Sequence, residues 1–178
     1  LVELTVDLSA NLSAALFDRT LDLTFQNGPF ARQTSGNIAI RAYPFVWVAA
    51  PGLGMNAAAP AKLQDLLTHP ILTHARGTLA YDQLAAHLAA PRSGLHPQLV
   101  PSSNLAACLQ MAIDGYGLAC LPYEMAAQPL SNGALVQVNY EWAPAPLEFL
   151  ARFDARSGRA FVPDAARLAN VIAMGPTA

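Results

Sequence analysis

The side chains best suited to hold a small molecule gather in three short polar stretches. Gln26 and Asn27 close the alternating segment 21–27, residues 73–78 read Thr-His-Ala-Arg-Gly-Thr, and residues 102–104 read Ser-Ser-Asn. Each stretch follows a predicted strand. Ligands of open α/β sheets bind beyond the carboxyl ends of the strands, where helix N-termini present free N–H groups. Each stretch alone fits helix capping and turn chemistry, but the three together predict a small-molecule site.

Signatures of catalysis and of metal binding are missing from the chain. It contains no G-x-S-x-G elbow, no H-E-x-x-H, no P-loop and no G-x-G-x-x-G motif after a strand. His69, His74, His87 and His96 follow one another at spacings of 5, 13 and 9 residues, which match no common zinc site. We therefore expect a protein that is not an enzyme and that holds no metal and no cofactor.

Two further residue pairs have simple structural interpretations. Glu141 and Glu148 could face one another as a carboxylate pair, but their alternating surroundings favour the wet faces of two strands. Cys108 and Cys120 lie in apolar surroundings and are too few for a disulfide framework, so we expect two buried free thiols and a reducing compartment. Cys108 has no obvious histidine partner that would make it a nucleophile.

The composition describes a globular chain without a nucleic-acid surface. The 178 residues are 53% hydrophobic and 12% charged, with a net charge of -2, and Lys62 is the sole lysine. This length fits one domain or two interleaved ones. The 10 lysine and arginine residues are spread too thinly to build a phosphate-binding surface. No run approaches the ~18 apolar residues of a membrane span, and the start at Leu1 predicts that the natural protein continues upstream.

Hydrophobic periodicity alternates between strand and helix along the whole chain, which predicts an α/β fold. The first 30 residues predict a strand, a helix and a strand, a unit that normally forms a right-handed crossover in a parallel sheet. Residues 51–60, rich in Pro, Gly and Ala, are the best candidate linker. We expect strands at 1–7, 21–27, 37–50 with a break near Pro44, 71–73, 96–103, 118–121, 135–142 and 147–155, and helices at 9–20, 62–67, 77–90, 103–114, 123–127 and 163–173.

The same residues predict how the helices begin and which way they face. In the last helix, Leu168 and Ile172 stand four apart and are expected to point inward. Short hydroxyl and amide side chains are favoured at helix N-caps because they accept a hydrogen bond from the first turn. The expected N-caps are Ser9 or Asn11 for the first helix, Thr78 for the third and Ser103 for the fourth.

Residues 113–122, IDGYGLACLP, combine a helix end, a strand and a helix start. Gly115 supplies the left-handed position that ends a helix, and Gly117 lets the next strand begin in close contact with neighbouring backbone. Residues 118–121 are short, continuous and apolar, as a fully covered parallel strand is. Pro122 suits the first turn of the following helix.

Several segments of the chain, taken in order, resemble LysR-type transcriptional regulators. LVELTVD…ALFDRTLDLTF is similar to the family's v.LEL….L..g.lDlal segment, and FVWVAAPGLGM stands where the family has an apolar strand leading into a linker. KLQDLLTHPIL resembles the l.dL...p.i segment, and NGALVQV resembles G.Lv.v. VPSSNLAACLQMAIDGYGLACLP, which resembles v.s......v..G.Gia.LP, is the most specific of these. The match covers nearly the whole chain.

This resemblance implies the effector-binding domain of such a regulator, with the fold of type-2 periplasmic binding proteins. Two α/β subdomains would be joined by crossover strands, with residues 1–51 plus 139–178 in the first and residues 52–138 in the second. By the family pattern, this chain lacks the N-terminal winged helix-turn-helix, the linker helix, and the first strand and helix of the effector domain. A sheet without its opening strand would have an unpaired edge.

In function, the resemblance implies a sensor whose small-molecule inducer binds between the subdomains and controls DNA binding and transcription through the absent N-terminal domain. It also implies a cytoplasmic homodimer or homotetramer without membrane contact. Arg76 would suit a carboxylate effector, and Tyr116 and Gly117 would border the cleft by analogy with the family. The expected effector contacts are Gln26, Asn27, Thr73, His74, Arg76, Gly77, Thr78, Ser102, Ser103, Asn104, Tyr116 and Gly117.

Two other classes of protein stay open. A stand-alone periplasmic solute-binding protein would have the same fold and a signal peptide upstream of Leu1, whereas a regulator would have a helix-turn-helix there. An enzyme built on the same two-domain cleft is disfavoured because the catalytic constellations are missing.

Overall fold

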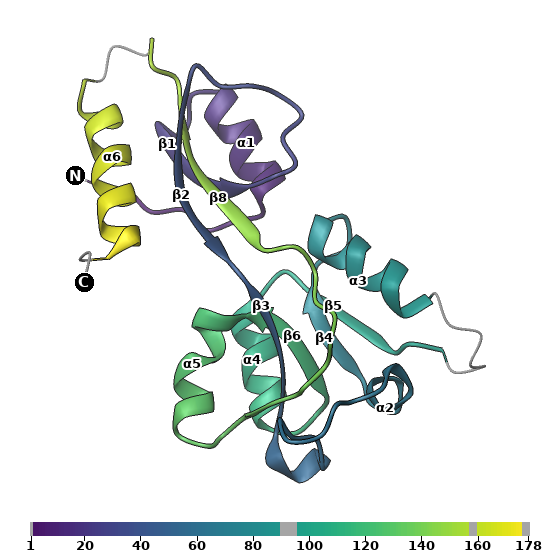
Figure 1. Cartoon of the computed structure of the whole chain (residues 1–178). Coiled ribbons are helices and arrows are strands. Elements are labelled where there is room, and N and C mark those ends of the chain that lie inside the picture. Colours follow the sequence, from purple (N-terminus) through teal and green to yellow (C-terminus); the bar gives the residue numbers. More distant parts are fainter. Residues whose placement is uncertain (1, 90–95, 157–159, 176–178) are drawn as a thin grey trace. The chain divides into compact units, whose positions relative to one another are not determined.

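The chain divides into two compact units. The computed structural model describes residues 2–89, 96–156 and 160–175. Unit 1 comprises Leu1–Ala42 and Leu147–Ala178, and unit 2 comprises Tyr43–Pro146, so the chain passes between the units twice (Figure 1). The chain leaves unit 1 between residues 42 and 43 and returns to it between residues 146 and 147. The expected boundaries between the subdomains were residues 51/52 and 138/139. The boundaries differ because the strand at residues 45–49 hydrogen-bonds to the sheet of unit 2.

Unit 1 is built on a sheet of three strands, β1 (Leu23–Asn27), β8 (Leu147–Phe153) and β2 (Gly36–Tyr43), in the order β1-β8-β2. Strands β1 and β8 run antiparallel, with Leu23 opposite Phe153 and Asn27 opposite Phe149. Helices α1 (Ser9–Phe17) and α6 (Phe161–Met174) lie on opposite sides of this sheet (Figure 1). Ile40, Ala151, Phe153, Val162 and Ala166 form the core between the sheet and α6.

The expected strand at residues 1–7 is wrong. Residues 2–7 have no regular structure and are exposed. An alternating pattern describes the two faces of a strand, but a strand also needs a neighbouring strand for its backbone hydrogen bonds, and residues 2–7 pair with none of the described strands. The predicted parallel crossover therefore does not form, and β1 pairs antiparallel with β8. The expected cap of α1 is also wrong, since Leu8 occupies the N-cap position without a side-chain hydrogen bond.

Unit 2 has a sheet of five strands in the order β5-β4-β6-β3-β7. Strand β4 pairs parallel with β5 and β6, and β3 pairs antiparallel with β6 and β7. The predicted linker lies within this unit and begins with a short 3-10 turn, Pro51–Leu53. The elements are β3 (Phe45–Ala49), α2 (Leu63–Leu67), β4 (Ile71–His74), α3 (Leu79–Ala89), β5 (Leu99–Ser102), α4 (Leu105–Ile113), β6 (Leu118–Pro122), α5 (Tyr123–Ser131) and β7 (Val136–Gln137).

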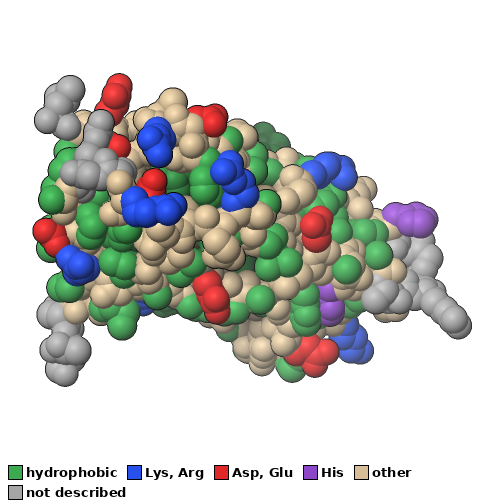
Figure 2. Space-filling view, turned by 90° about the horizontal axis from the view of Figure 1, so that it is seen from above, with side chains coloured by type: hydrophobic (Ala, Val, Ile, Leu, Met, Phe, Trp, Pro, Cys, Tyr) green, Lys and Arg blue, Asp and Glu red, His purple; other side chains and the backbone are tan. Residues whose placement is uncertain are grey.

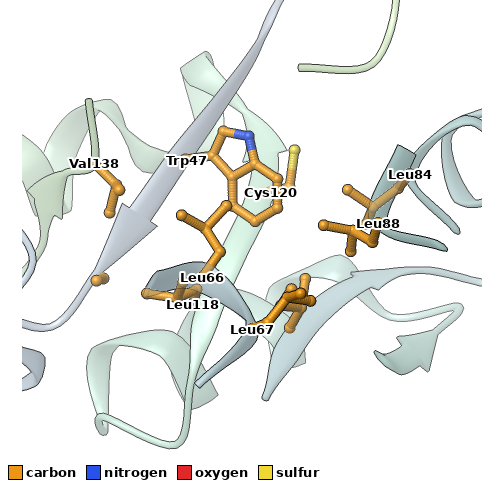
Figure 3. Packing of buried hydrophobic residues seen from close by; sticks show 10 residues of the cluster. Trp47, Leu66, Leu67, Leu84, Leu88, Leu118, Cys120 and Val138 are labelled. Carbon is orange, nitrogen blue, oxygen red and sulfur yellow. The ribbon is translucent and has the colours of Figure 1, made fainter. Parts of the chain in front are cut away.

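The core of unit 2 has two clusters, one on each face of the sheet. Successive residues of β3 point to opposite faces and so belong to different clusters. Trp47 belongs to the first cluster and its neighbours Val46 and Val48 to the second. Figure 3 shows Trp47 in the first cluster with Cys120 beside it and with Leu84 and Leu88 reaching in from α3. The second cluster contains Val46, Val48, Leu72, Cys108, Ala112, Ala119, Leu121, Ala126 and Leu135. The expectation of two buried free thiols is confirmed.

Residues 113–122 adopt most of the predicted conformation. Gly115 has φ of +79° after the end of α4, and a Cβ on Gly117 would lie 2.3 Å from the carbonyl oxygen of Pro70. The N–H of Leu118 donates to that same oxygen at 2.9 Å. Every residue of β6 is buried. Pro122 ends β6 and occupies the N-cap position of α5 rather than its first turn.

The last helix faces the sheet differently from the prediction. Leu168 and Ile172 are 60% and 70% exposed, whereas Val162 and Ala166 are buried. Residues four apart lie on the same face of a helix, and α6 has two such pairs, Leu168 with Ile172 and Val162 with Ala166. The pair with the smaller side chains, Val162 and Ala166, packs against β8. In the part of the chain that the structure describes, no helix has the length and apolar character needed to cross a membrane.

The predicted strand at 135–142 shortens to the two residues of β7. Beyond β7 the chain is held by side chains and single backbone bonds. The N–H of Val138 donates to the carbonyl of Trp47 at 2.9 Å, and the indole Nε1 of Trp47 donates to the carbonyl of Trp142 at 2.8 Å. These bonds attach the segment that leads back to unit 1 to the sheet of unit 2.

The contact at Gly117 predicts a specific loss of stability. Gly117→Ala should lower the free energy of unfolding of unit 2 by about 1–3 kcal/mol, because the new Cβ meets backbone that is already hydrogen-bonded. Urea unfolding followed by tryptophan fluorescence measures it. Gly52→Ala is the matched control, since a Cβ there meets nothing within 4 Å. Equal unfolding midpoints for the two variants would contradict the packing described for β6.

The orientation of α6 predicts unequal effects of one substitution at two positions. Val162→Ala should cost about 1–3 kcal/mol because Val162 is 1% exposed, and Val171→Ala should be nearly neutral because Val171 is 64% exposed. Thermal unfolding of the two variants beside the wild type provides the measurement. The inward face assigned to α6 is wrong if Val171→Ala is the more damaging change.

Candidate functional site

Two of the three predicted polar stretches meet at one edge of the unit 2 sheet. Strands β4 and β5 are parallel, and His74 lies opposite Ser102 in their register. Helix α4 begins directly after Asn104, whose Oδ1 accepts a hydrogen bond from the N–H of Ala107 at 3.2 Å. Asn104, and not the predicted Ser103, is therefore the N-cap. We call this place, Thr73 and His74 with residues 75–78 and 102–104, the β4–β5 edge.

His74 is the most unusual side chain of the β4–β5 edge. It is 8% exposed, and neither ring nitrogen has a hydrogen-bond partner in the part of the chain that is described. The ring of Phe45 meets it edge to face at 5.2 Å. Burial lowers the pKa of His74 from 6.5 to about 4, so at neutral pH the ring is an uncharged imidazole with one free donor and one free acceptor. A buried polar group without a partner costs roughly 1–3 kcal/mol.

The turn between β4 and α3 is a well-formed cap. Gly77 has φ of +80°. The hydroxyl of Thr78 donates to the carbonyl of Ala75 at 2.8 Å and accepts from the N–H of Tyr81 at 3.3 Å, which confirms Thr78 as the cap of α3. Arg76 is exposed, and its Nη1 donates to the hydroxyl of Tyr81 at 2.8 Å. The remaining N–H groups of the Arg76 guanidinium can meet an anion.

Tyr116 and Gly117 lie away from the β4–β5 edge. Strand β6 is parallel to β4, and Leu118 pairs with Ile71, the first residue of β4. The residues that precede Leu118 are therefore at the amino ends of the strands, whereas the β4–β5 edge is at their carboxyl ends. Gly117 serves the packing against Pro70. The structure does not bring these two residues together with the eight predicted residues of the β4–β5 edge.

Gln26 and Asn27, in unit 1, are occupied by internal hydrogen bonds. Gln26 is 0% exposed; its Oε1 accepts from Nη1 of Arg152 at 2.9 Å, and its Nε2 donates to the hydroxyl of Thr24 at 2.6 Å. Asn27 is half-buried, and its Oδ1 accepts from the hydroxyl of Ser9 at 2.9 Å. In this structure Gln26 is thus an internal partner of an arginine and not a surface group.

Arg152 was not identified by the sequence analysis. It is 1% exposed, although a single arginine in the alternating segment LEFLARF reads as a solvent-facing position. Its guanidinium donates to Gln26, to the hydroxyl of Ser13 at 3.3 Å and to the carbonyl of Arg32. No periodicity or motif signals this role, because it depends on α1 and the loop after β1 covering the same face of β8.

The other histidines do not form a metal site. His87 stacks on Trp142 at 3.8 Å, and its Nε2 lies 2.7 Å from the hydroxyl of Tyr140. Burial lowers the pKa of His87, and the nearby Glu141 opposes this shift. His96 is exposed. Over residues 2–89, 96–156 and 160–175, no group of three or more His, Cys, Asp or Glu side chains could hold a metal ion.

Charge is dispersed on the surface. On the face seen in Figure 2, lysine and arginine side chains lie apart from one another, with acidic or apolar side chains between them. Glu141 and Glu148 are both exposed, as expected for residues on wet faces. The face seen in Figure 2 has no continuous basic stripe of the kind on which nucleic-acid binding depends.

Comparisons with known proteins identify the family of this fold. The LysR substrate binding domain matches residues 1–161. Comparison with curated proteins gave no match.

Among solved structures, three regulators illustrate the similarity. The reduced regulatory domain of OxyR2 from Vibrio vulnificus is 20% identical, with a TM-score of 0.69, over 94% of this chain and 78% of that one. The effector domain of the transcriptional regulator AmpR of Pseudomonas aeruginosa is 19% identical, with a TM-score of 0.66, over 89% and 75%. The regulatory domain of MetR, a LysR family regulator from N. meningitidis, is 17% identical, with a TM-score of 0.61, over 88% and 75%.

At these identities the structures demonstrate a shared fold, the type-2 periplasmic-binding-protein-like fold expected from the sequence. The family itself follows from the domain match, which spans most of the chain. Effector domains of LysR-type regulators are not enzymes, in agreement with the sequence analysis. The chain therefore belongs to the LysR family of transcriptional regulators and is a substrate-binding domain of that family.

Proposed function

We propose that this domain senses a small-molecule effector at the β4–β5 edge of unit 2, with His74 as a direct contact. The single observation that carries the proposal is the buried imidazole of His74, whose two nitrogens have no partner in the described residues. Ligand sites in α/β sheets lie beyond the carboxyl ends of the strands, which is where His74 stands. A ligand that hydrogen-bonds to the ring would remove the cost of leaving it unpaired.

The side chains at this edge suit an effector with an acidic or hydroxyl group on a small body. The hydroxyl of Ser102 accepts from the N–H of Asn104 at 3.0 Å and donates to its carbonyl at 3.3 Å. Ser103 is exposed next to the start of α4, a helix N-terminus that favours negative charge. Arg76 adds an exposed cation to the same edge. The residues that we retain as effector contacts are Thr73, His74, Arg76, Gly77, Thr78, Ser102, Ser103 and Asn104.

In the whole regulator, the effector would shift the domain between two conformations that differ in affinity for it. The change would pass to an N-terminal helix-turn-helix domain, and through it to DNA and transcription. We further propose that the regulator works in the cytoplasm as a homodimer or homotetramer. Light scattering of the complete regulator, and DNA binding measured with and without effector, test these parts of the proposal.

The effector site can be tested by a screen followed by matched variants. A library of small carboxylic and hydroxy acids is screened by thermal shift, since a ligand at 100 times its Kd stabilises by about 2.7 kcal/mol. His74→Phe should weaken a hit at least 10-fold, the order expected when a hydrogen bond of about 1.4 kcal/mol is lost. His87→Gln, in the same unit, should leave the affinity unchanged. A hit that binds His74→Phe as tightly as the wild type would show that His74 is not a contact.

The burial of His74 also predicts a pH dependence of stability. The folded-state pKa of about 4 lies below the ordinary value of 6.5, so between these values the unfolded chain binds the proton more readily. Stability is then complete above about pH 6.5 and decreases as the pH falls toward 4, by on the order of 3 kcal/mol from this residue.

Urea unfolding at several pH values, compared between variants, measures this contribution. Because carboxyl groups titrate in the same range, the informative quantity is the difference between proteins. His74→Phe should have a shallower decrease than the wild type. Parallel curves for wild type and His74→Phe would refute the described environment of the ring.

A further inference from the structure

The guanidinium of Arg152 is a buried charge whose contacts are all neutral. Its hydrogen-bond acceptors are the amide oxygen of Gln26, the hydroxyl of Ser13 and the backbone carbonyl of Arg32. The ring of Phe30 lies 4.0 Å from its Cζ, and its Nε has no partner among the described residues. Burial lowers the pKa of Arg152, but a guanidinium stays protonated in proteins. Burying an ion without an opposite charge is costly, and burial is normally accompanied by pairing.

A second arginine approaches the same place from the surface. The Cζ of Arg32 lies 3.8 Å from the ring centre of Phe17, and the Cζ of Arg152 lies 6.0 Å from the same centre. Arg32 is exposed. Neither of the ion pairs described in unit 1, Arg156 with Asp154 and Arg167 with Asp164, involves Arg32 or Arg152. Two like charges on one aromatic ring repel one another, and the π face offsets only part of this repulsion.

We propose that Arg32 and Arg152 form a binding site in unit 1 for a small oxyanion, such as a carboxylate, phosphate or sulfate group. The guanidinium fork matches the geometry of these anions, and Arg32 provides the entry from solvent. Ser13 completes the site, because a hydroxyl that accepts from Arg152 keeps its own hydrogen to donate to an anion. All of these residues belong to unit 1, and the proposal does not rest on the effector contacts of the β4–β5 edge.

The anion site explains features that stability alone does not require. A purely structural role would be served by an apolar side chain on β8, because replacing a buried ionic group by an apolar one of similar volume is often neutral or stabilising. Arg152 on β8 instead hydrogen-bonds to Ser13 on α1 and to the loop at Arg32. Its positive charge therefore lies where β8, α1 and this loop meet. Occupation by an anion would strengthen this link between α1, β1 and the loop after it.

The test uses the purified chain and three named probes. Sodium succinate, phosphate and sulfate are titrated against sodium chloride at matched ionic strength, by calorimetry and by thermal shift. We expect saturable binding by at least one oxyanion and, at ten times its Kd, an increase in Tm of about 3–5 °C. The three probes distinguish a carboxylate site from a phosphate or sulfate site.

Matched variants separate specific binding from the general stabilisation that sulfate and phosphate give to folded proteins. Arg32→Gln removes one exposed guanidinium and should weaken binding at least fivefold. Arg167→Gln removes another exposed arginine of the same unit, which lies on α6 and pairs with Asp164, and should leave the affinity unchanged. Arg152→Met, if circular dichroism shows it folded, should abolish saturable binding. His74→Phe, in the other unit, should bind the anion like the wild type.

Two results would overturn the proposal. One is a response to all three oxyanions that does not saturate or that equals the response to chloride. The other is equal affinity in Arg32→Gln and Arg167→Gln, which would leave Arg152 as an internal link between α1, β1 and the following loop. Neither result bears on the β4–β5 edge, whose own test depends on His74.

Discussion

Strand β6 lies between β4 and β3, and all of its residues are buried. A strand in this position must have its full set of backbone hydrogen bonds, and its start must pass close to the end of the segment before β4. Gly117 allows this because a Cβ there would lie 2.3 Å from the carbonyl oxygen of Pro70. This contact lies beside the parallel pairing of β4 with β6, in which Ile71 is opposite Leu118. On its other side β4 pairs with β5, which puts His74 opposite Ser102, so the strand that carries His74 is held between β6 and β5.

Among the residues that the structure describes, each unit contains one buried polar side chain that its own neighbours do not fully satisfy. In unit 2 it is His74, which remains uncharged at neutral pH because its pKa is lowered to about 4. In unit 1 it is Arg152, which retains its charge and has an unpaired Nε. A neutral imidazole suits a hydrogen-bonding group of either polarity, whereas a guanidinium suits an anion. The difference in chemistry is why we assign different ligands to the two places.

Much of the candidate site could be predicted from local sequence. Polar residues after an apolar strand mark a carboxyl end, and this reasoning predicted Thr73, His74 and residues 102–104 as site residues. Tyr116, which was added by analogy with the family, lies apart from them, because the residues before β6 are at the opposite end of the parallel strands. Gln26 was predicted as an effector contact, but it is buried against Arg152, which lies 126 residues away in the chain and on a strand that pairs antiparallel with β1.

The sequence by itself determined the α/β alternation, most strand and helix positions, the cap at Thr78, the helix end at Gly115 and the family, because these depend on periodicity, caps and ordered motifs that are local along the chain. Only the tertiary structure decided which row of α6 is buried, that residues 2–7 form no strand, and that unit 2 begins before β3. It also decided that Arg152 is internal. Each of these depends on which segments distant in sequence become neighbours. Burial and strand pairing need two surfaces in contact, and the local sequence of a segment describes only one of those two surfaces.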